Sequence, residues 1–218
     1  FVVIARGIIA ACDYFADFSS SRTDPQNFPF ATWAKLMREI ISEKSAELMV
    51  NAPCGGVFEL RCAIAEHLRE FRGIDADPNC IVVGAGTEYL YGLLIQLLGF
   101  DKVYALEDPG YRKIAQVYES YGVQYRFTPM DKEGIDPKAL EKSGADILHI
   151  SPSHHFPTGI VTPIARRYTL LDWAAQSENS YIIEDDYDSE FRLTGKPIPA
   201  LQSIDSADRV IYMNTFTK

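Results

Sequence analysis

The sequence lacks the patterns that would assign a membrane protein or a nucleic-acid-binding domain at once. It has no run of about 20 apolar residues, the length that an α-helix needs to cross a bilayer, and Arg6 interrupts its apolar start. It also has no run of lysines and arginines, and its 30 acidic residues outnumber its 21 basic ones to give a net charge of −9. An acidic chain of this kind is a poor candidate for binding nucleic acid by itself. We therefore expect that this segment neither spans a membrane nor contacts DNA.

Cysteine is scarce and scattered. The four cysteines are Cys12, Cys54, Cys62 and Cys80. No two of them form a C-x-x-C pair, which fits neither a disulfide framework nor a zinc site. Two adjacent histidines, His154 and His155, have no third ligand at the spacing of a metal site. We expect free thiols in a reducing, cytoplasmic compartment and no bound metal.

The first part of the chain has the pattern of helices. Apolar residues make up 47% of the sequence and charged residues 23%, as in a folded globular domain. From residue 31 to residue 41 the apolar residues recur at helical spacing, and a second helical pattern ends at Gly73. In that second helix we expect a buried stripe of Leu60, Ile64, Leu68 and Phe71.

After residue 75 short apolar runs alternate with helical patterns. The runs predicted as strands are 81–83, 103–106, 125–127, 147–150, 181–183 and 210–212, and the predicted helices are 90–98, 114–121, 137–142 and 166–175. Apolar strands of this kind, separated by helices, indicate a parallel sheet that is covered on both faces. We predict an α/β fold of three layers, α/β/α, with a mostly parallel sheet. Residues 1–75 would form an N-terminal arm and helices, and residues 76–218 a large domain.

In open parallel sheets a ligand binds beyond the carboxyl ends of the strands, so the residues that follow each strand are candidates for a site. Gly86, Thr87 and Glu88 open a helix whose free N–H groups suit a phosphate. The glycine pattern is not a complete dinucleotide or P-loop fingerprint, so a plain tight turn explains it equally well. Tyr111 follows the second strand after a turn, and it can present its ring to a planar ligand or pack on its own helix.

The last three predicted strands are followed by polar groups. His154 and His155 stand in the loop after the strand at 147–150. Five acids fall between residues 184 and 190, and at least one must point into the site because they follow an apolar strand directly. A carboxylate there can hold a protonated ring nitrogen or a divalent cation, although a solvated face is the simpler alternative. After the last strand come two threonines and Lys218, which by itself reads as an ordinary surface cation.

Together these residues offer a phosphate seat, an aromatic plate, an acid for a ring nitrogen, a phenol and a lysine amine. Pyridoxal 5′-phosphate (PLP) needs this set, because its aldehyde condenses with a lysine and its pyridinium nitrogen pairs with an acid. From about Asp17 onward the chain resembles the fold-type I PLP-dependent enzymes of the aspartate aminotransferase superfamily. It resembles most the aminotransferase-like domain of MocR-type (GntR-family) transcriptional regulators. The stretches that carry the resemblance are Leu60-Arg61 with Arg72-Gly73, 107–111, 152–159, 182–191 and 215–218.

The resemblance implies a role for each candidate residue. Lys218 would be the Schiff-base lysine, Asp185 the partner of the pyridinium nitrogen, and Tyr187 the donor to the phenolic oxygen of the ring. Tyr111 would stack on the ring, and His154 would lie near it. The phosphate would be held by Gly86, Thr87 and the Glu88 backbone, with Thr215 and Thr217 as further candidates.

Three departures from the family pattern stand beside this resemblance. Asn51 occupies the position of a tyrosine that, in aminotransferases, reaches the phosphate of the neighbouring subunit, and His155 replaces a glutamine of the MocR pattern. The family also continues beyond Lys218 with a last strand and a small domain, whose arginine grips the substrate carboxylate. We therefore expect that the large domain is incomplete at its C-terminal end, that the small domain is missing, and that further sequence precedes Phe1.

The function implied by the resemblance is formation of an aldimine on Lys218 and its exchange with a small amino acid or amine. In a regulator this exchange would be the signal, in a homodimer that contacts DNA only through a separate N-terminal domain. The alternative is a stand-alone aminotransferase that moves an amino group between an amino acid and a 2-oxo acid. A PLP-free scaffold used for dimerisation is a third possibility, but Lys218 and Asp185 argue against it. Catalytic turnover and the identity of the amino ligand are left open.

Overall fold

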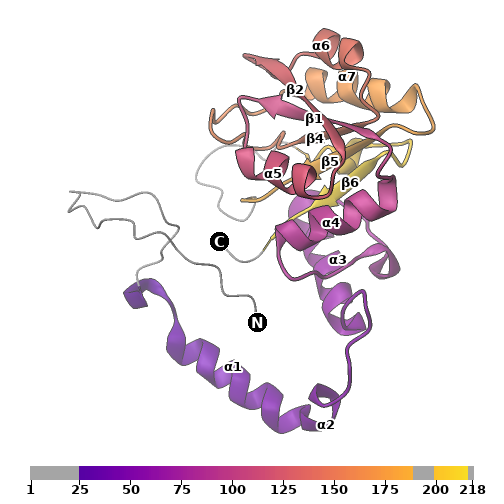
Figure 1. The fold of residues 1–218 in the computed structure, drawn as a ribbon. Helices are drawn as coiled ribbons and strands as arrows, with labels where there is room; N and C mark the ends of the chain where they lie inside the picture. Colours follow the sequence, from indigo (N-terminus) through magenta and orange to yellow (C-terminus); the bar gives the residue numbers. More distant parts are fainter. Residues whose placement is uncertain (1–24, 189–198, 216–218) are drawn as a thin grey trace, which may run out of the picture. The chain divides into compact units, whose positions relative to one another are not determined.

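The computed structural model describes residues 25–188 and 199–215, and it divides the chain into two compact units, residues 1–51 and 52–218 (Figure 1). In the first unit, the described elements are η1 (Pro25–Asn27), α1 (Phe30–Glu43) and α2 (Ser45–Leu48). The predicted helix at 31–41 is confirmed as α1. No residue of α1 is buried, and its apolar side includes Trp33 and Leu36. The domain division at residue 75 stays a prediction.

The second unit is built on a six-stranded sheet in the order β3-β2-β1-β4-β5-β6. Its strands are β1 (Val103–Asp108), β2 (Gln124–Asp131), β3 (Gly134–Ile135), β4 (Ile147–Ile150), β5 (Tyr181–Asp185) and β6 (Val210–Met213). Every pair of neighbours is parallel except β2 and β3. The parallel sheet and five of its strands were predicted correctly, whereas the two-residue strand β3 was too short to leave a pattern.

Helices cover both faces of this sheet and complete three layers (Figure 1). The α-helices of this unit are α3 (Phe58–Arg72), α4 (Thr87–Leu98), α5 (Arg112–Ser120), α6 (Pro137–Ser143) and α7 (Ile164–Ala175), and the short 3-10 turns are η2 (Pro78–Cys80) and η3 (Gln202–Ile204). Alternate strand residues face opposite layers. Tyr104 of β1 packs with α4 and α5, and its neighbour Ala105 packs with α6 and α7. The predicted α/β/α fold is therefore confirmed, and the same alternation decides where the polar residues at the strand ends point.

Two local predictions were wrong. Residues 81–83 form no strand. Val82 is 52% exposed, and the Val83 N–H donates to the Gly55 carbonyl at 3.0 Å instead of joining the sheet. In α3 the expected apolar stripe is not buried throughout, since Leu60 and Phe71 are exposed. The buried positions of α3 are Leu68 and Arg72, and the helix ends as predicted at Gly73, which has a φ of 69° that favours glycine.

No helix within the described ranges is long and apolar enough to cross a membrane. Three of the four cysteines lie in the described ranges, and Cys54, Cys62 and Cys80 are free thiols there.

Candidate functional site

Asp185 ends β5 at the carboxyl edge of the sheet, and its side chain is 6% exposed. Its Oδ2 accepts a hydrogen bond of 2.6 Å from the Tyr91 hydroxyl of α4. The Nε2 atom of His149, on the neighbouring strand β4, lies 3.8 Å from the same oxygen. Among the described residues Oδ1 of Asp185 has no hydrogen-bond partner, although it is buried. A buried carboxylate oxygen without a partner is costly, so this atom is suited to meet a group outside the described chain.

The acids on either side of Asp185 point to the opposite face of the sheet, as strand alternation requires. Glu184 accepts the backbone N–H groups of Leu201 and Gln202, at 2.8 and 2.9 Å. Asp186 forms a buried ion pair of 2.7 Å with Arg72 of α3. Each of these acids has partners on its own face, and neither forms a solvated face. Oδ1 of Asp186, like Oδ1 of Asp185, is buried without a hydrogen-bond partner among the described residues. Asp185 is the one that points toward α4.

The Tyr212 hydroxyl donates to Oδ2 of Asp186 at 2.6 Å. Arg72 in turn donates to the Ser153 hydroxyl at 3.0 Å, in the loop that carries His154. Asp186 follows Asp185, and Ser153 precedes His154. Arg72 joins these two neighbours, and no role in the site was predicted for this arginine from the sequence. The signal available in the sequence was Arg72 itself, in the Arg-Gly pair that ends α3.

The start of α4 lies at the same edge of the sheet. Gly86 caps the helix with a φ of 96°, and a Cβ added there would meet no atom within 4 Å. Thr87 and Glu88 form the first turn, whose backbone N–H groups lack partners within the helix. The Glu88 side chain pairs with Lys113 of α5. This open, glycine-capped helix start has the geometry of an anion seat.

The aromatic candidates make two separate ring contacts, one by Tyr111 and one between His154 and Tyr187. Tyr111 immediately precedes α5, is 49% exposed, and meets Phe156 edge-on with ring centroids 6.0 Å apart. His154 stacks on Tyr187 with ring centroids 6.1 Å apart, and its Nδ1 lies 2.5 Å from Oδ2 of Asp188. Burial, together with the nearby carboxylates, raises the pKa of Tyr187 to about 12, so its phenol keeps its proton.

A second buried pair links the loops that carry these aromatics. Glu107 of β1 accepts the Ser151 N–H at 3.0 Å, and Nε2 of His155 lies 3.5 Å from its carboxylate. Burial raises the pKa of Glu107 to about 8. Burial and the neighbouring His154 lower the pKa of His155. His155, which replaces the glutamine of the MocR pattern, is therefore buried against Glu107 in the loop that carries His154.

Some predicted residues are not placed with this group. Thr217 and Lys218 lie outside the described residues. Thr215 is described, two residues beyond Met213, which pairs with Asp185 in the sheet. Asn51 belongs to the first unit.

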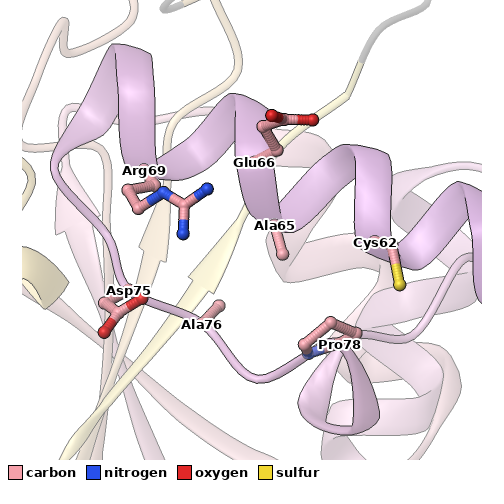
Figure 2. Close-up of a pocket in the computed structure, with 7 residues that line it drawn as sticks. All are labelled: Cys62, Ala65, Glu66, Arg69, Asp75, Ala76 and Pro78. Carbon is pink, nitrogen blue, oxygen red and sulfur yellow. The ribbon is translucent and has the colours of Figure 1, made fainter.

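Within residues 25–188 and 199–215 no three histidine, cysteine or acidic side chains form a cluster that could hold a metal ion. A surface groove of about 410 Å³ contains none of the predicted site residues. It runs along α3 and the segment that follows it (Figure 2), and its lining is Cys62, Ala65, Glu66, Arg69, Asp75, Ala76 and Pro78.

The arrangement at the strand ends agrees with the chain's similarity to known proteins. Residues 18–218 match the model of the family described as aminotransferase class I and II. The chain belongs to this family. The resemblance predicted from the sequence is thereby confirmed.

The relatives include transcriptional regulators. The chain is 39% identical over 202 residues to the uncharacterized HTH-type transcriptional regulator YdeL of Bacillus subtilis, covering 93% of the chain and 43% of that protein. It is 32% identical over 192 residues to the probable rhizopine catabolism regulatory protein MocR of Rhizobium meliloti, covering 88% of the chain and 39% of that protein.

Solved aminotransferases share the fold. An archaeal alanine:glyoxylate aminotransferase superposes with a TM-score of 0.79 at 25% identity, over 88% of this chain and 49% of that one. LysN, an α-aminoadipate aminotransferase from Thermus thermophilus complexed with N-(5′-phosphopyridoxyl)-L-leucine, gives 0.78 at 26% identity, over 89% and 50%. The chain thus spans between 39% and 50% of the length of these four proteins.

Proposed function

We propose that this aminotransferase-like domain binds PLP on a lysine and lets a small amino acid or amine take the place of that lysine, as the effector-sensing domain of a MocR/GntR-type transcriptional regulator. The observation that carries the proposal is the Asp185 carboxylate, buried at the strand ends with Oδ1 unpartnered among the described residues. Such an oxygen suits the protonated nitrogen of an aromatic ring. The open start of α4 adds a seat for a phosphate.

The chain's own residues would divide the work. Bound PLP supplies an aldehyde that condenses with primary amines and a protonated ring that withdraws electrons from the amine carbon. Asp185 would accept the hydrogen bond of the ring nitrogen, and Tyr187 would donate to the phenolic oxygen with the proton that its raised pKa retains. Gly86, Thr87 and Glu88 would hold the phosphate through backbone N–H groups.

The remaining candidates would bind the ring and its aldehyde. Tyr111 would lie over the ring, and His154, held by Asp188, would border it next to Tyr187. Thr215 and Thr217 would add hydroxyl donors, and Lys218 would supply the amine that binds the cofactor covalently and moves protons during exchange.

The regulator is favoured over the enzyme by the relatives. MocR and YdeL are named as regulators, and each is more than twice as long as the matched segment. In that setting a separate N-terminal domain would contact DNA, the protein would act as a cytoplasmic homodimer, and this acidic segment would stay off the DNA. The stand-alone aminotransferase is the alternative, favoured by the folds of the solved neighbours.

An absorbance scan of the purified full-length protein tests the proposal. We expect a band near the edge of the visible range that shifts when amino acids are added, and that is lost in Lys218→Ala. Lys142→Ala is the matched control, because Lys142 is exposed in the last turn of α6, which carries no candidate residue, and the variant should leave the band in place. Absence of the band from the wild-type protein, or its persistence unchanged in Lys218→Ala, contradicts PLP binding. Turnover with a 2-oxo acid acceptor would favour the enzyme.

A further inference from the structure

We propose that Tyr91 is a positioning residue that fixes Asp185 for a ring nitrogen, and that Tyr118 and His149 help to orient this carboxylate. The four residues form one buried row, Tyr118, His149, Asp185 and Tyr91, drawn from α5, β4, β5 and α4. The inference rests on the proposed function, since it names what holds the acid that PLP would need. Neither tyrosine nor His149 was singled out by its sequence pattern, because each reads as an ordinary core residue.

The hydrogen bond from Tyr91 distinguishes the two oxygens of Asp185, because Oδ2 accepts it and Oδ1 has no partner among the described residues. Tyr91 is 3% exposed, and its hydroxyl donates to Oδ2 at 2.6 Å, the short distance typical of a charged acceptor. Burial raises the pKa of Tyr91, so the phenol stays protonated and acts as the donor. With Oδ2 held in this way, Oδ1 is the oxygen left to receive a partner.

His149 adds a favourable electrostatic contact from the neighbouring strand. Its Nδ1 lies 2.7 Å from the Tyr118 hydroxyl, and its Nε2 lies 3.8 Å from Oδ2 of Asp185. Burial raises the pKa of Tyr118 well above its ordinary value, so its hydroxyl keeps the proton and can donate to Nδ1. We assign the tautomer from this network. Nε2 then carries its hydrogen on the side of Asp185, so the imidazole turns the positive end of its N–H dipole to Oδ2 across 3.8 Å without a hydrogen bond.

Helix α4 carries both the candidate phosphate seat and Tyr91, the residue that binds Asp185. Gly86, Thr87 and Glu88 lie at the start of this helix, and Tyr91 lies one turn further along. One rigid helix would therefore hold the phosphate with its first turn and orient Asp185 with its second. Removing only the Tyr91 hydroxyl should weaken recognition of the ring nitrogen. It also removes a side-chain hydrogen bond with Thr87, but it leaves the backbone N–H groups of the phosphate seat in place.

A comparison of two ligands isolates this effect. The dissociation constants of PLP and of an analogue with CH in place of the ring nitrogen are measured on the full-length protein, for the wild type and Tyr91→Phe. We expect Tyr91→Phe to weaken PLP binding about tenfold, the loss of a hydrogen bond to a charged group. Binding of the analogue should change less than twofold, because it has no ring nitrogen for Asp185 to meet.

Tyr104→Phe is the matched control. Tyr104 is fully buried in the same aromatic core, but its hydroxyl donates to the Gly99 carbonyl at 3.0 Å and not to Asp185. It should change the affinity for neither ligand. The NMR shift of a ¹⁵N-labelled ring nitrogen gives a second readout: we expect a protonated nitrogen in the wild type and in Tyr104→Phe, and a smaller protonated fraction in Tyr91→Phe.

Tyr118→Phe tests the other end of the row. It removes the donor to His149, and we expect a smaller loss of PLP affinity that is again absent for the analogue. Equal weakening of both ligands by Tyr91→Phe, or a nitrogen shift unchanged from the wild type, overturns the positioning role while PLP binding itself stands. Failure of the wild type to bind PLP overturns the proposed function, and this inference with it.

Discussion

At the scale of single residues, the site depends on buried charges that are paired one by one. Arg72 and Asp186 form an ion pair of 2.7 Å with side-chain exposures of 5% and 0%. The guanidinium also donates to Ser153. Removing one partner of such a pair leaves the other charge buried and uncompensated, which is far more damaging than losing a surface pair. Arg72 therefore binds Asp186, the neighbour of Asp185, and Ser153, the neighbour of His154.

We predict that Arg72→Met lowers the free energy of unfolding by about 3–5 kcal/mol. Arg69→Met is the control, because Arg69 is exposed in the same last turn of α3 and has the same relation to the helix dipole. The control should change stability by less than about 0.5 kcal/mol. Urea unfolding followed by circular dichroism measures both. Equal losses in the two variants would show that the ion pair contributes no more than a surface arginine does.

The residue scale also shows how far the sequence could predict the site. Five acids fall between residues 184 and 190, the first two within β5, but their composition does not tell which of them faces the ligand. The resemblance chose Asp185, and strand alternation explains why Glu184 and Asp186 turn away. Tyr91 and His149 had no signal of their own, and Arg72 had only the Arg-Gly pair that ends α3. The role of a buried hydroxyl, imidazole or guanidinium is recognised only from its partner. Those partners are 94, 36 and 114 residues away in the chain, which no local pattern records.

At the scale of elements, the apolar runs predicted β1, β4 and β5 because strands buried on both faces need apolar residues throughout. The short runs of β2 and β6 also predicted strands, although β2 is largely exposed and β6 is mostly half-buried. The same rule predicted a strand at residues 81–83, which was wrong. These three apolar residues pair with no strand in the described chain, and Val82 faces solvent. Run length alone cannot show whether a neighbour exists. Helix ends were easier to predict, because Gly73 needs only a local left-handed conformation.

Helix α7 also contributes at this scale, through Arg167. This arginine is fully buried and donates to the carbonyls of Thr162, Pro152 and Pro199, at 2.9, 2.7 and 2.8 Å. Its Nη1 lies 3.8 Å from Glu184 of β5. One side chain thus joins the loop after β4 to the segment before η3 and to β5.

We predict that Arg167→Met lowers the free energy of unfolding by about 3–5 kcal/mol, since it leaves three carbonyls without their donor and Glu184 without its neighbouring cation. Glu184→Gln should cost less stability in the Arg167→Met background than in the wild type, with a coupling of about 1–3 kcal/mol, because it then no longer removes the ion pair with Arg167. Urea unfolding of the two single variants and the double variant measures the coupling. Strict additivity would contradict a direct interaction between the two side chains.

At the scale of the whole molecule, the buried acid Glu107 should make stability depend on pH. Burial raises its pKa from an ordinary 4.5 to about 8, and the charge of Asp185 adds to this. The Ser151 N–H acts in the opposite direction. His155 faces the carboxylate at 3.5 Å, but its pKa is lowered, so it is neutral above pH 7 and does not compensate the charge. The folded state therefore binds a proton that the unfolded state has released between these two pKa values.

The sign follows from proton linkage. Where the folded state holds more protons than the unfolded state, stability falls as pH rises, here between about pH 4.5 and pH 8. Glu107→Gln mimics the neutral acid, since its amide oxygen can take the place of Oε2, which accepts the Ser151 N–H and lies 3.5 Å from Nε2 of His155. We expect Glu107→Gln to gain stability relative to the wild type as pH rises from 5 to 8.5. Unfolding midpoints across this range, with the exposed Glu141→Gln as the control for loss of one negative charge, measure the effect. A difference between Glu107→Gln and the wild type that stays constant across the range would mean that Glu107 is already ionised in the folded protein.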